Sequence, residues 1–256
     1  MAGAARPLLS RLLTPNHIAM AAGHSPSPTR RLAHLTRHLL APSSSSGELS
    51  SVGAPAAAAP VRATASKGFA AVLVCIFQDP RGDTRVLLTK RASSLNSHSG
   101  EVSLPGGKVE DGDADVKTTA LREAEEEIGL DPALVSVVTV LEPFLSKNGL
   151  DVTPVIGILS DRSLFNPVLN KDEVEDIFDA PLEMFLKDDN RTTRQRDWMG
   201  MTIPVQFFHY ETEGKKYVIW GLTAHILTRA AAVVLQRQPS FAELPRPKSA
   251  PLGSKH

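Results

Sequence analysis

Three glutamates at helical spacing are the residues of this chain best suited to chemistry. Glu123, Glu126 and Glu127 are offset by three and four positions, so on a helix all three lie on one flank. Like charges one turn apart destabilise each other, and the negative end of the helix dipole adds to that cost. A bound cation compensates such an arrangement, and carboxylate oxygens suit Mg²⁺ or Mn²⁺. The alternative is an acidic helix face that is simply solvated.

The glutamates require a helix whose ends the sequence marks clearly. Asp113 or Asp115 can cap its start, because a carboxylate oxygen accepts an N–H of the first turn. Gly129 is placed to reverse the backbone after the last turn, and Pro132 prevents continuation. An apolar stripe that repeats every four residues predicts the buried face: Val116, Ala120, Ala124 and Ile128.

The segment before the helix carries cations and a glycine pair. Leu87–Gly107 runs into the acidic stretch, so Lys90 and Arg91 are expected near the glutamates, where they would hold substrate phosphates. For Lys90 an ordinary surface position after a strand is the alternative. Gly106 and Gly107 allow the backbone to pass close to the site, where a side chain would clash.

Together these residues carry a family resemblance. The glycine pair, the acidic loop and Arg122–Leu130 (REAEEEIGL) resemble the Nudix hydrolase signature, G-x5-E-x7-R-E-U-x-E-E-x-G-U with U apolar. Asp113 stands where the loop glutamate is expected, with one extra residue before Arg122. The resemblance implies a diphosphatase that uses Mg²⁺ or Mn²⁺ held by Glu123, Glu126 and Glu127. Arg122 would orient these carboxylates through an ion pair. Glu126 in the first place, or a further acid such as Glu173, would act as general base. For Glu173 a solvated acidic edge is the alternative.

A second pattern narrows the expected substrate. Leu87–Gly107 is similar to the signature of the coenzyme A diphosphatase branch, although Asn96 replaces an arginine and Leu104 a phenylalanine. The resemblance implies hydrolysis of coenzyme A, or of an acyl-coenzyme A, to 3′,5′-ADP and 4′-phosphopantetheine or its acyl form. Two alternatives stay open: a Nudix diphosphatase acting on NADH or ADP-ribose, and a catalytically silent Nudix-fold binding module.

Charge and composition divide the chain into three parts. Residues 1–65 contain six arginines, no lysine and one acid, which predicts a transit peptide and disordered linker. We expect a mitochondrial address, with a plastid as the alternative, or the cytosol if the extension is not a transit peptide. Residues 66–238 are expected to form the Nudix domain and residues 239–256 a Pro-rich tail. The acidic remainder predicts no nucleic-acid partner, and no apolar run is long enough to span a membrane.

Within the expected domain, strands alternate with two main helices. This order predicts an α/β class fold, an α/β/α sandwich around a mixed sheet, and the Nudix resemblance implies the same fold with a loop–helix–loop metal site. Lys187–Asp197 is expected to be a charged connection, and Cys75 a packed core residue. The expected strands are Phe69–Phe77, Arg85–Lys90, Ala133–Leu145, Val152–Leu159, Asp172–Leu182, Thr202–Tyr210 and Lys216–Trp220, and the closing helix is Leu222–Arg237.

Overall fold

The computed structural model describes residues 67–198 and 200–242, and the predictions for residues 1–65 and for most of the C-terminal tail lie outside these ranges. The strands are β1 (Phe69–Gln78), β2 (Thr84–Arg91), β3 (Val102–Ser103), β4 (Gly106–Lys108), β5 (Val135–Val140), β6 (Phe144–Leu145), β7 (Asp151–Leu159), β8 (Val174–Pro181), β9 (Arg191–Trp198), β10 (Met201–Thr212) and β11 (Lys215–Trp220). The α-helices are α2 (Val116–Ile128) and α3 (Gly221–Leu235), and 3₁₀ turns cover Pro132–Leu134, Arg162–Leu164 and Leu182–Leu186.

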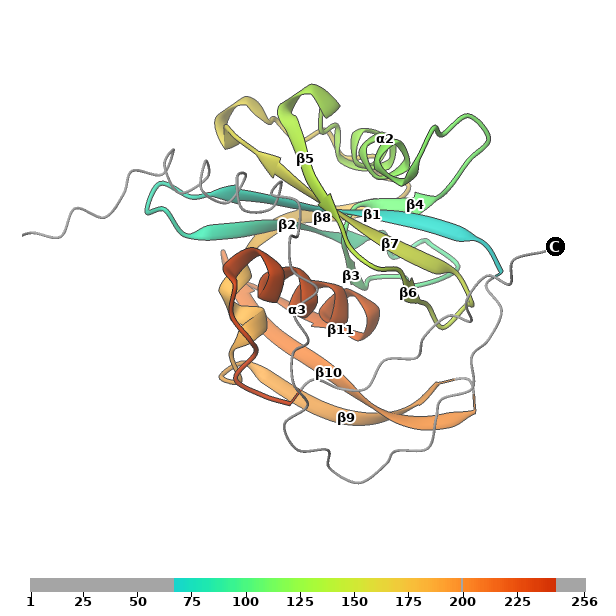
Figure 1. Cartoon of the computed structure of the whole chain (residues 1–256), viewed down its shortest axis with the longest axis vertical. Coiled ribbons are helices and arrows are strands. Elements are labelled where there is room, and N and C mark those ends of the chain that lie inside the picture. The colour runs from blue at the N-terminus through green and yellow to red at the C-terminus, as the bar shows by residue number, and fades with distance from the viewer. Residues whose placement is uncertain (1–66, 199, 243–256) are drawn as a thin grey trace, which may run out of the picture.

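A mixed sheet forms the middle of the molecule (Figure 1). Its strand order is β3-β2-β1-β7-β5, with β4, β6 and β8 pairing with β1, β7 and β2. The central pair β1 and β7 is parallel over eight residues, and the other pairs are antiparallel. This sheet brings β4 and the end of β2 to the same side of the molecule, where the glycine pair and Arg91 lie.

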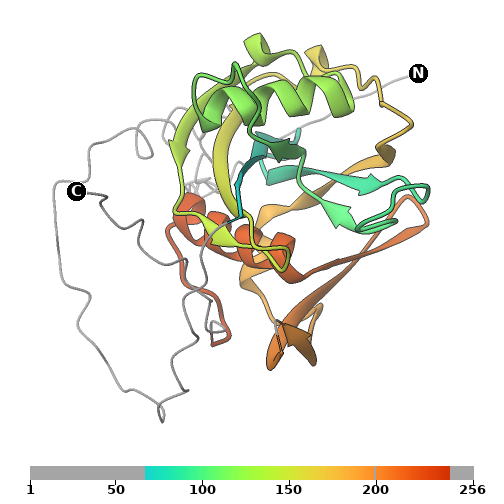
Figure 2. The ribbon, with the colours of Figure 1, turned by 90° about the vertical axis from the view of Figure 1, so that its right-hand side faces the viewer.

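Helices cover both faces of the mixed sheet, as Figures 1 and 2 show. Successive residues of β1 alternate between the two faces, because side chains of a strand point to opposite sides. Leu73 and Cys75 pack with α2, whereas Val74 and Ile76 pack with α3. The predicted sandwich around a mixed sheet is therefore confirmed. Cys75 is a core residue, and burial raises the pKa of its thiol to about 12.

A three-stranded sheet below α3 corrects the sequence-based prediction. Lys187–Asp197 is not merely a charged connection, because Arg191–Trp198 forms β9 and pairs antiparallel with β10. β9 is an edge strand, and two of its arginines, Arg194 and Arg196, lie over the ring of Phe207. The sheet order is β11-β10-β9.

The other expected elements differ from the structure by small amounts. The predicted strand Ala133–Leu145 is divided into a 3₁₀ turn, β5 and the short β6, with Pro143 in the gap, where a proline cannot donate a ladder hydrogen bond. The hairpin around Gly214 and the closing helix are confirmed within two residues. In the described ranges no helix is both long and apolar enough to cross a bilayer.

Candidate active site

The helix α2 presents the glutamates to the rest of the site. Asp115 is its N-cap, and the carboxylate accepts hydrogen bonds from the backbone N–H groups of Lys117 and Thr118. Gly129 ends the helix in the left-handed region, at φ 69°. Ala120, Ala124 and Ile128 are fully buried against the sheet. This anchoring turns the flank with Glu123 and Glu127 towards the glycine pair of β4.

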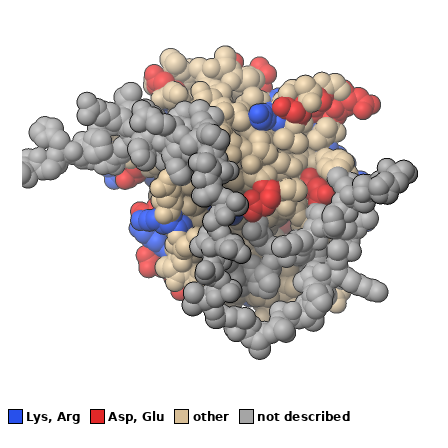
Figure 3. All heavy atoms as spheres, viewed as in Figure 1, with Lys and Arg blue, Asp and Glu red and all other residues tan. Residues whose placement is uncertain are grey.

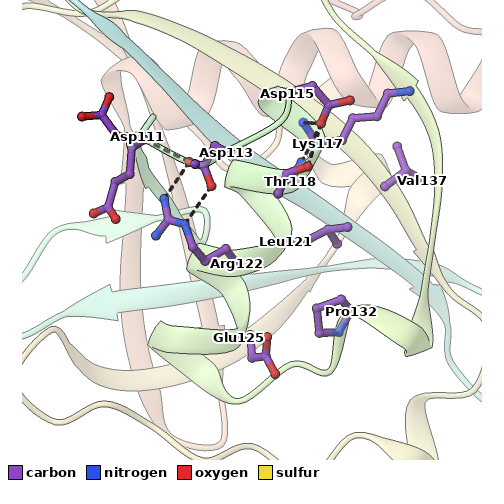
Figure 4. A pocket seen from close by; sticks show the side chains of 12 residues that line it. Asp111, Asp113, Asp115, Lys117, Thr118, Leu121, Arg122, Glu125, Pro132 and Val137 are labelled. Atoms are coloured by element: carbon purple, nitrogen blue, oxygen red, sulfur yellow. Dashed lines mark hydrogen bonds and ion pairs between the residues drawn. The ribbon is translucent and has the colours of Figure 1, made fainter.

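Arg122 ties the preceding loop to the glutamates. Its guanidinium donates two hydrogen bonds to Asp113, of 3.1 and 3.0 Å, which are drawn in Figure 4. The same group donates to Glu123 at 3.1 Å, to Glu126 at 3.0 Å and to the carbonyl of Lys108 at 3.2 Å. Its hydrogen bonds hold the pKa of Asp113 well below the usual range. Arg122 therefore fixes the positions of two predicted ligands and of the loop.

Glu127 lies deepest in the group, with 2% of the residue exposed. One carboxylate oxygen accepts a 3.2 Å hydrogen bond from the N–H of Gly106, and the other lies 3.7 Å from a guanidinium nitrogen of Arg91. Burial raises its pKa to about 8, although Gly106 and Arg91 act in the opposite direction. These neighbours thus compensate its negative charge incompletely.

The glycine pair makes room for the carboxylates. A Cβ on Gly107 would clash with the carboxylate of Glu123, and one on Gly106 would clash with the backbone of β1. Gly106 also has a φ of 153°, which side chains disfavour. The backbone of β4 can therefore lie close to β1 at Gly106 and close to the acidic flank of α2 at Gly107.

The other acids of the site are Glu123, Glu126 and Glu173. Burial raises the pKa of Glu123, and the negative charges of Glu126 and Glu173 raise it further. Glu173 raises the pKa of Glu127 in the same way. Its backbone is linked to α2 through Asn170, which is hydrogen-bonded to both Glu127 and Glu173. The side chain of Glu126 is 57% exposed and lies at the outer edge of the group, paired with Arg122.

The cations of β2 separate onto opposite faces of the sheet. Arg91 faces α2, and its buried Nε has no hydrogen-bond partner among the described residues. Lys90 instead forms a 2.6 Å ion pair with Glu175, whose other oxygen accepts a hydrogen bond from Ser93. The structure therefore brings Arg91, but not Lys90, to the carboxylates. A bulge between these two residues interrupts the regular pairing of β2 with β8.

One polar residue near the glutamates was not anticipated from the sequence. The N–H of Asn170 donates to the carbonyl of Glu127 at 2.9 Å, and the side-chain amide donates to Glu173 at 3.3 Å. The stretch Asn170–Asp172 shows only a turn signal, which says nothing about where the turn docks.

The carboxylate oxygens at the site are of the kind that a hard divalent cation takes. In the part of the chain that the structure describes, no three acidic, histidine or cysteine side chains form a ready metal cage. The reason is that Glu123 and Glu126 are turned to Arg122, while Glu127 is turned to Gly106. The buried, incompletely compensated carboxylate of Glu127 nevertheless matches the oxygen ligands that Mg²⁺ or Mn²⁺ takes.

An open hollow of about 710 Å³ lies beside α2 but is lined by neither Glu127 nor Arg91 (Figure 4). Leu121, Pro132 and Val137 line it together with Glu125 and the acidic loop. Acidic side chains also gather over the loop between β4 and α2 in the space-filling view of Figure 3. Glu125 thus points away from the candidate site on the same helix.

Comparisons with known proteins agree with this geometry. The family model described as NUDIX domain matches residues 68–201. "Nudix hydrolase 15, mitochondrial" of Arabidopsis thaliana is 63% identical over 174 residues, covering 68% of this chain and 61% of that protein. "Nudix hydrolase 22, chloroplastic" of the same plant is 60% identical over 192 residues, covering 75% and 63%.

A more distant relative is named for its substrate. The peroxisomal coenzyme A diphosphatase of Mus musculus is 36% identical over 162 residues, covering 62% of this chain and 68% of that protein. The matched part of the chain spans about three fifths of the length of the two plant relatives.

Proposed function

The chain belongs to the Nudix hydrolase family, and on this premise we propose that it is a metal-dependent diphosphatase acting on coenzyme A. The observation that carries the proposal is the buried Glu127, which faces Arg91 and the glycine pair with its charge incompletely compensated. A solvated acidic helix face has no use for a carboxylate that is 2% exposed.

Glu123, Glu126 and Glu127 are the proposed ligands of Mg²⁺ or Mn²⁺. When bound, such an ion neutralises charge on the diphosphate oxygens and makes a water molecule more acidic. Arg122 holds Glu123 and Glu126 at 3.1 and 3.0 Å, and thereby keeps two of these carboxylates in place. Gly106 holds the third through its backbone N–H.

We propose Glu173 as the general base. Asn170 joins Glu173 to the last turn of α2. The negative charge of Glu173 raises the pKa of both Glu123 and Glu127, whereas Glu126 is paired with Arg122 at the rim. In this account a Glu173 carboxylate oxygen accepts a proton from the attacking water, whose oxygen bonds to phosphorus as the P–O–P anhydride bond breaks. Glu126 is the alternative base.

Arg91 is the proposed phosphate-binding residue. Its buried Nε lacks a hydrogen-bond partner among the described residues, and an arginine donates to phosphate oxygens through two parallel N–H groups. Gly107 lets the backbone of β4 lie against the carboxylate of Glu123, where a side chain would clash. Lys90 would need to leave Glu175 before it could bind substrate, and so contributes less.

The proposed substrate follows from the mouse relative named coenzyme A diphosphatase. Cleavage of the diphosphate of coenzyme A gives 3′,5′-ADP and 4′-phosphopantetheine. We also propose one Nudix domain over residues 66–238, because α3 and the β9–β11 sheet pack on the mixed sheet. The plant relative named mitochondrial supports a mitochondrial location, and the one named chloroplastic supports a plastid.

The chemistry is tested by comparing two glutamates of α2. The full chain is incubated with coenzyme A, NADH or ADP-ribose, with Mg²⁺ or with a chelator. We expect metal-dependent hydrolysis that Glu127→Gln lowers about 100-fold or more, because a ligand is lost. Glu125→Gln is the matched control on the opposite side of the helix, and we expect it to retain activity within about twofold. Equal loss in both variants, or hydrolysis without metal, would contradict the proposal.

A further inference from the structure

Asn170 occupies a junction between α2 and β8. Its backbone N–H donates to the carbonyl of Glu127 at 2.9 Å, which satisfies one of the unpaired carbonyls at the end of α2. Its own carbonyl accepts hydrogen bonds from the N–H groups of Glu173 and Val174, at 3.0 and 2.8 Å. The backbone of Asn170 therefore fixes the distance between the last turn of the helix and the first residues of β8.

The side chain of Asn170 makes two hydrogen bonds that require opposite ends of the amide. Its Oδ1 accepts from the N–H of Asp172 at 3.2 Å, and its Nδ2 donates to Oε1 of Glu173 at 3.3 Å. Turning the amide over would place its oxygen against the Glu173 carboxylate and its NH₂ group against an N–H. One orientation therefore satisfies both contacts.

The backbone of Glu173 is hydrogen-bonded to two different segments of the chain. Its N–H donates to Asn170, and its carbonyl accepts a 2.8 Å hydrogen bond from the N–H of Ala92, which follows Arg91. These contacts leave the carboxylate free to rotate about its side-chain bonds. Among the described contacts, the amide of Asn170 is the one that holds the carboxylate.

We infer that Asn170 is a positioning residue, whose side-chain amide directs the carboxylate of Glu173 towards the reacting water beside Glu123 and Glu127. The inference rests on the proposed function, in which Glu173 is the base. The amide donates to Oε1, so Oε2 remains available to accept the proton. Asn170 itself takes no part in bond making, since it acts through Glu173.

A purely structural role is the competing explanation, because the Asp172 contact alone forms a local turn. The variant Asn170→Ser distinguishes this structural role from the positioning role. A serine hydroxyl can still accept from the N–H of Asp172, as in related turns, but is too short to donate to Glu173. Asn170→Asp keeps the shape of the side chain and the oxygen that accepts from Asp172, and it removes the NH₂ group that donates to Glu173. It replaces the serine variant in the test if that variant folds poorly. Asn166→Ser, on an exposed part of the same loop, is the matched control.

The test is a double-mutant cycle with Glu173→Gln. Values of kcat and KM are measured on the full chain, with Mg²⁺, for whichever of coenzyme A, NADH and ADP-ribose is hydrolysed fastest. We expect Asn170→Ser and Asn170→Asp to lower kcat about 10- to 100-fold while KM stays within about twofold. In the Glu173→Gln background the same substitutions should have no further effect, because the group they position no longer acts as a base. Asn166→Ser should match the wild type.

Each other outcome identifies what fails. If Asn170→Ser lowers kcat by the same factor with and without Glu173→Gln, the positioning role is overturned and the diphosphatase activity stands. If Glu173→Gln alone keeps the wild-type kcat, Glu173 is not the base and the inference fails with it. If the wild-type chain hydrolyses none of the three substrates, the proposed function fails as well.

Discussion

Glu127 is the most deeply buried of the glutamates described at the site, with 2% of the residue exposed. Its pKa is raised to about 8 by burial, above the value of about 4.5 expected in an unfolded chain. The folded state therefore binds the proton more tightly than the unfolded state does. It follows that the contribution of Glu127 to stability is lost as the pH rises from about 4.5 to about 8.

This sign gives a prediction for the metal-free protein. With a chelator present, Glu127→Gln should raise the melting temperature at pH 8, because the variant no longer buries a charge, and the gain should vanish near pH 5. Added Mg²⁺ should stabilise the wild type at pH 8 and have little effect on the variant. Thermal unfolding over pH 5–8 measures both. Parallel pH profiles for the two proteins would show that Glu127 is not buried as a charge.

Arg122 acts through geometry as well as charge, since its five hydrogen bonds reach Asp113, Lys108, Glu123 and Glu126. A lysine keeps the charge but cannot reproduce the paired contacts with Asp113. Arg122→Lys should therefore lower kcat/KM about 10- to 100-fold with Mg²⁺ present. Arg237→Lys is the control, because Arg237 pairs with Glu183 on the surface and should change nothing measurable. Wild-type kinetics in Arg122→Lys would leave Arg122 without a positioning role.

Among the elements, α2 depends on its caps. Asp115 accepts hydrogen bonds from two backbone N–H groups and from the hydroxyl of Thr118. Asp115→Ala should lower the melting temperature by about 2–4 °C, since it removes a helix cap from a domain of this size. Asp111→Ala, in the same loop and exposed, should leave it unchanged. Equal melting temperatures for the two variants would mean that the cap adds no stability.

Some of the elements could be predicted from the sequence and others could not. The ends of α2 were predictable because Gly129 and an Asx residue are local signals, and its buried face because Ala120, Ala124 and Ile128 repeat every four residues. The strand β9 could not be predicted, because a polar strand at the edge of a sheet shows no alternation of apolar and polar residues. The contact between Asn170 and α2 joins segments more than forty positions apart, and no local pattern encodes it.

At the scale of the whole molecule, the mixed sheet assembles the site from separate parts of the chain. β2 delivers Arg91, β4 delivers the glycine pair, and the turn before β8 delivers Glu173 to one flank of α2. From the sequence, Lys90 and Arg91 were both expected near the glutamates. Because side chains alternate along β2, Lys90 instead pairs with Glu175 on the opposite face of the sheet from Arg91. Neighbours in sequence are therefore separated, and distant acids are brought together.

Substrate identity is the central claim, and one measurement tests it most directly. The full chain with Mg²⁺ is offered coenzyme A, NADH and ADP-ribose separately, and the products are identified by mass spectrometry. We predict release of 4′-phosphopantetheine and 3′,5′-ADP from coenzyme A with a kcat/KM at least about tenfold above the other two. A higher kcat/KM for NADH or ADP-ribose would contradict the coenzyme A assignment and retain the diphosphatase chemistry.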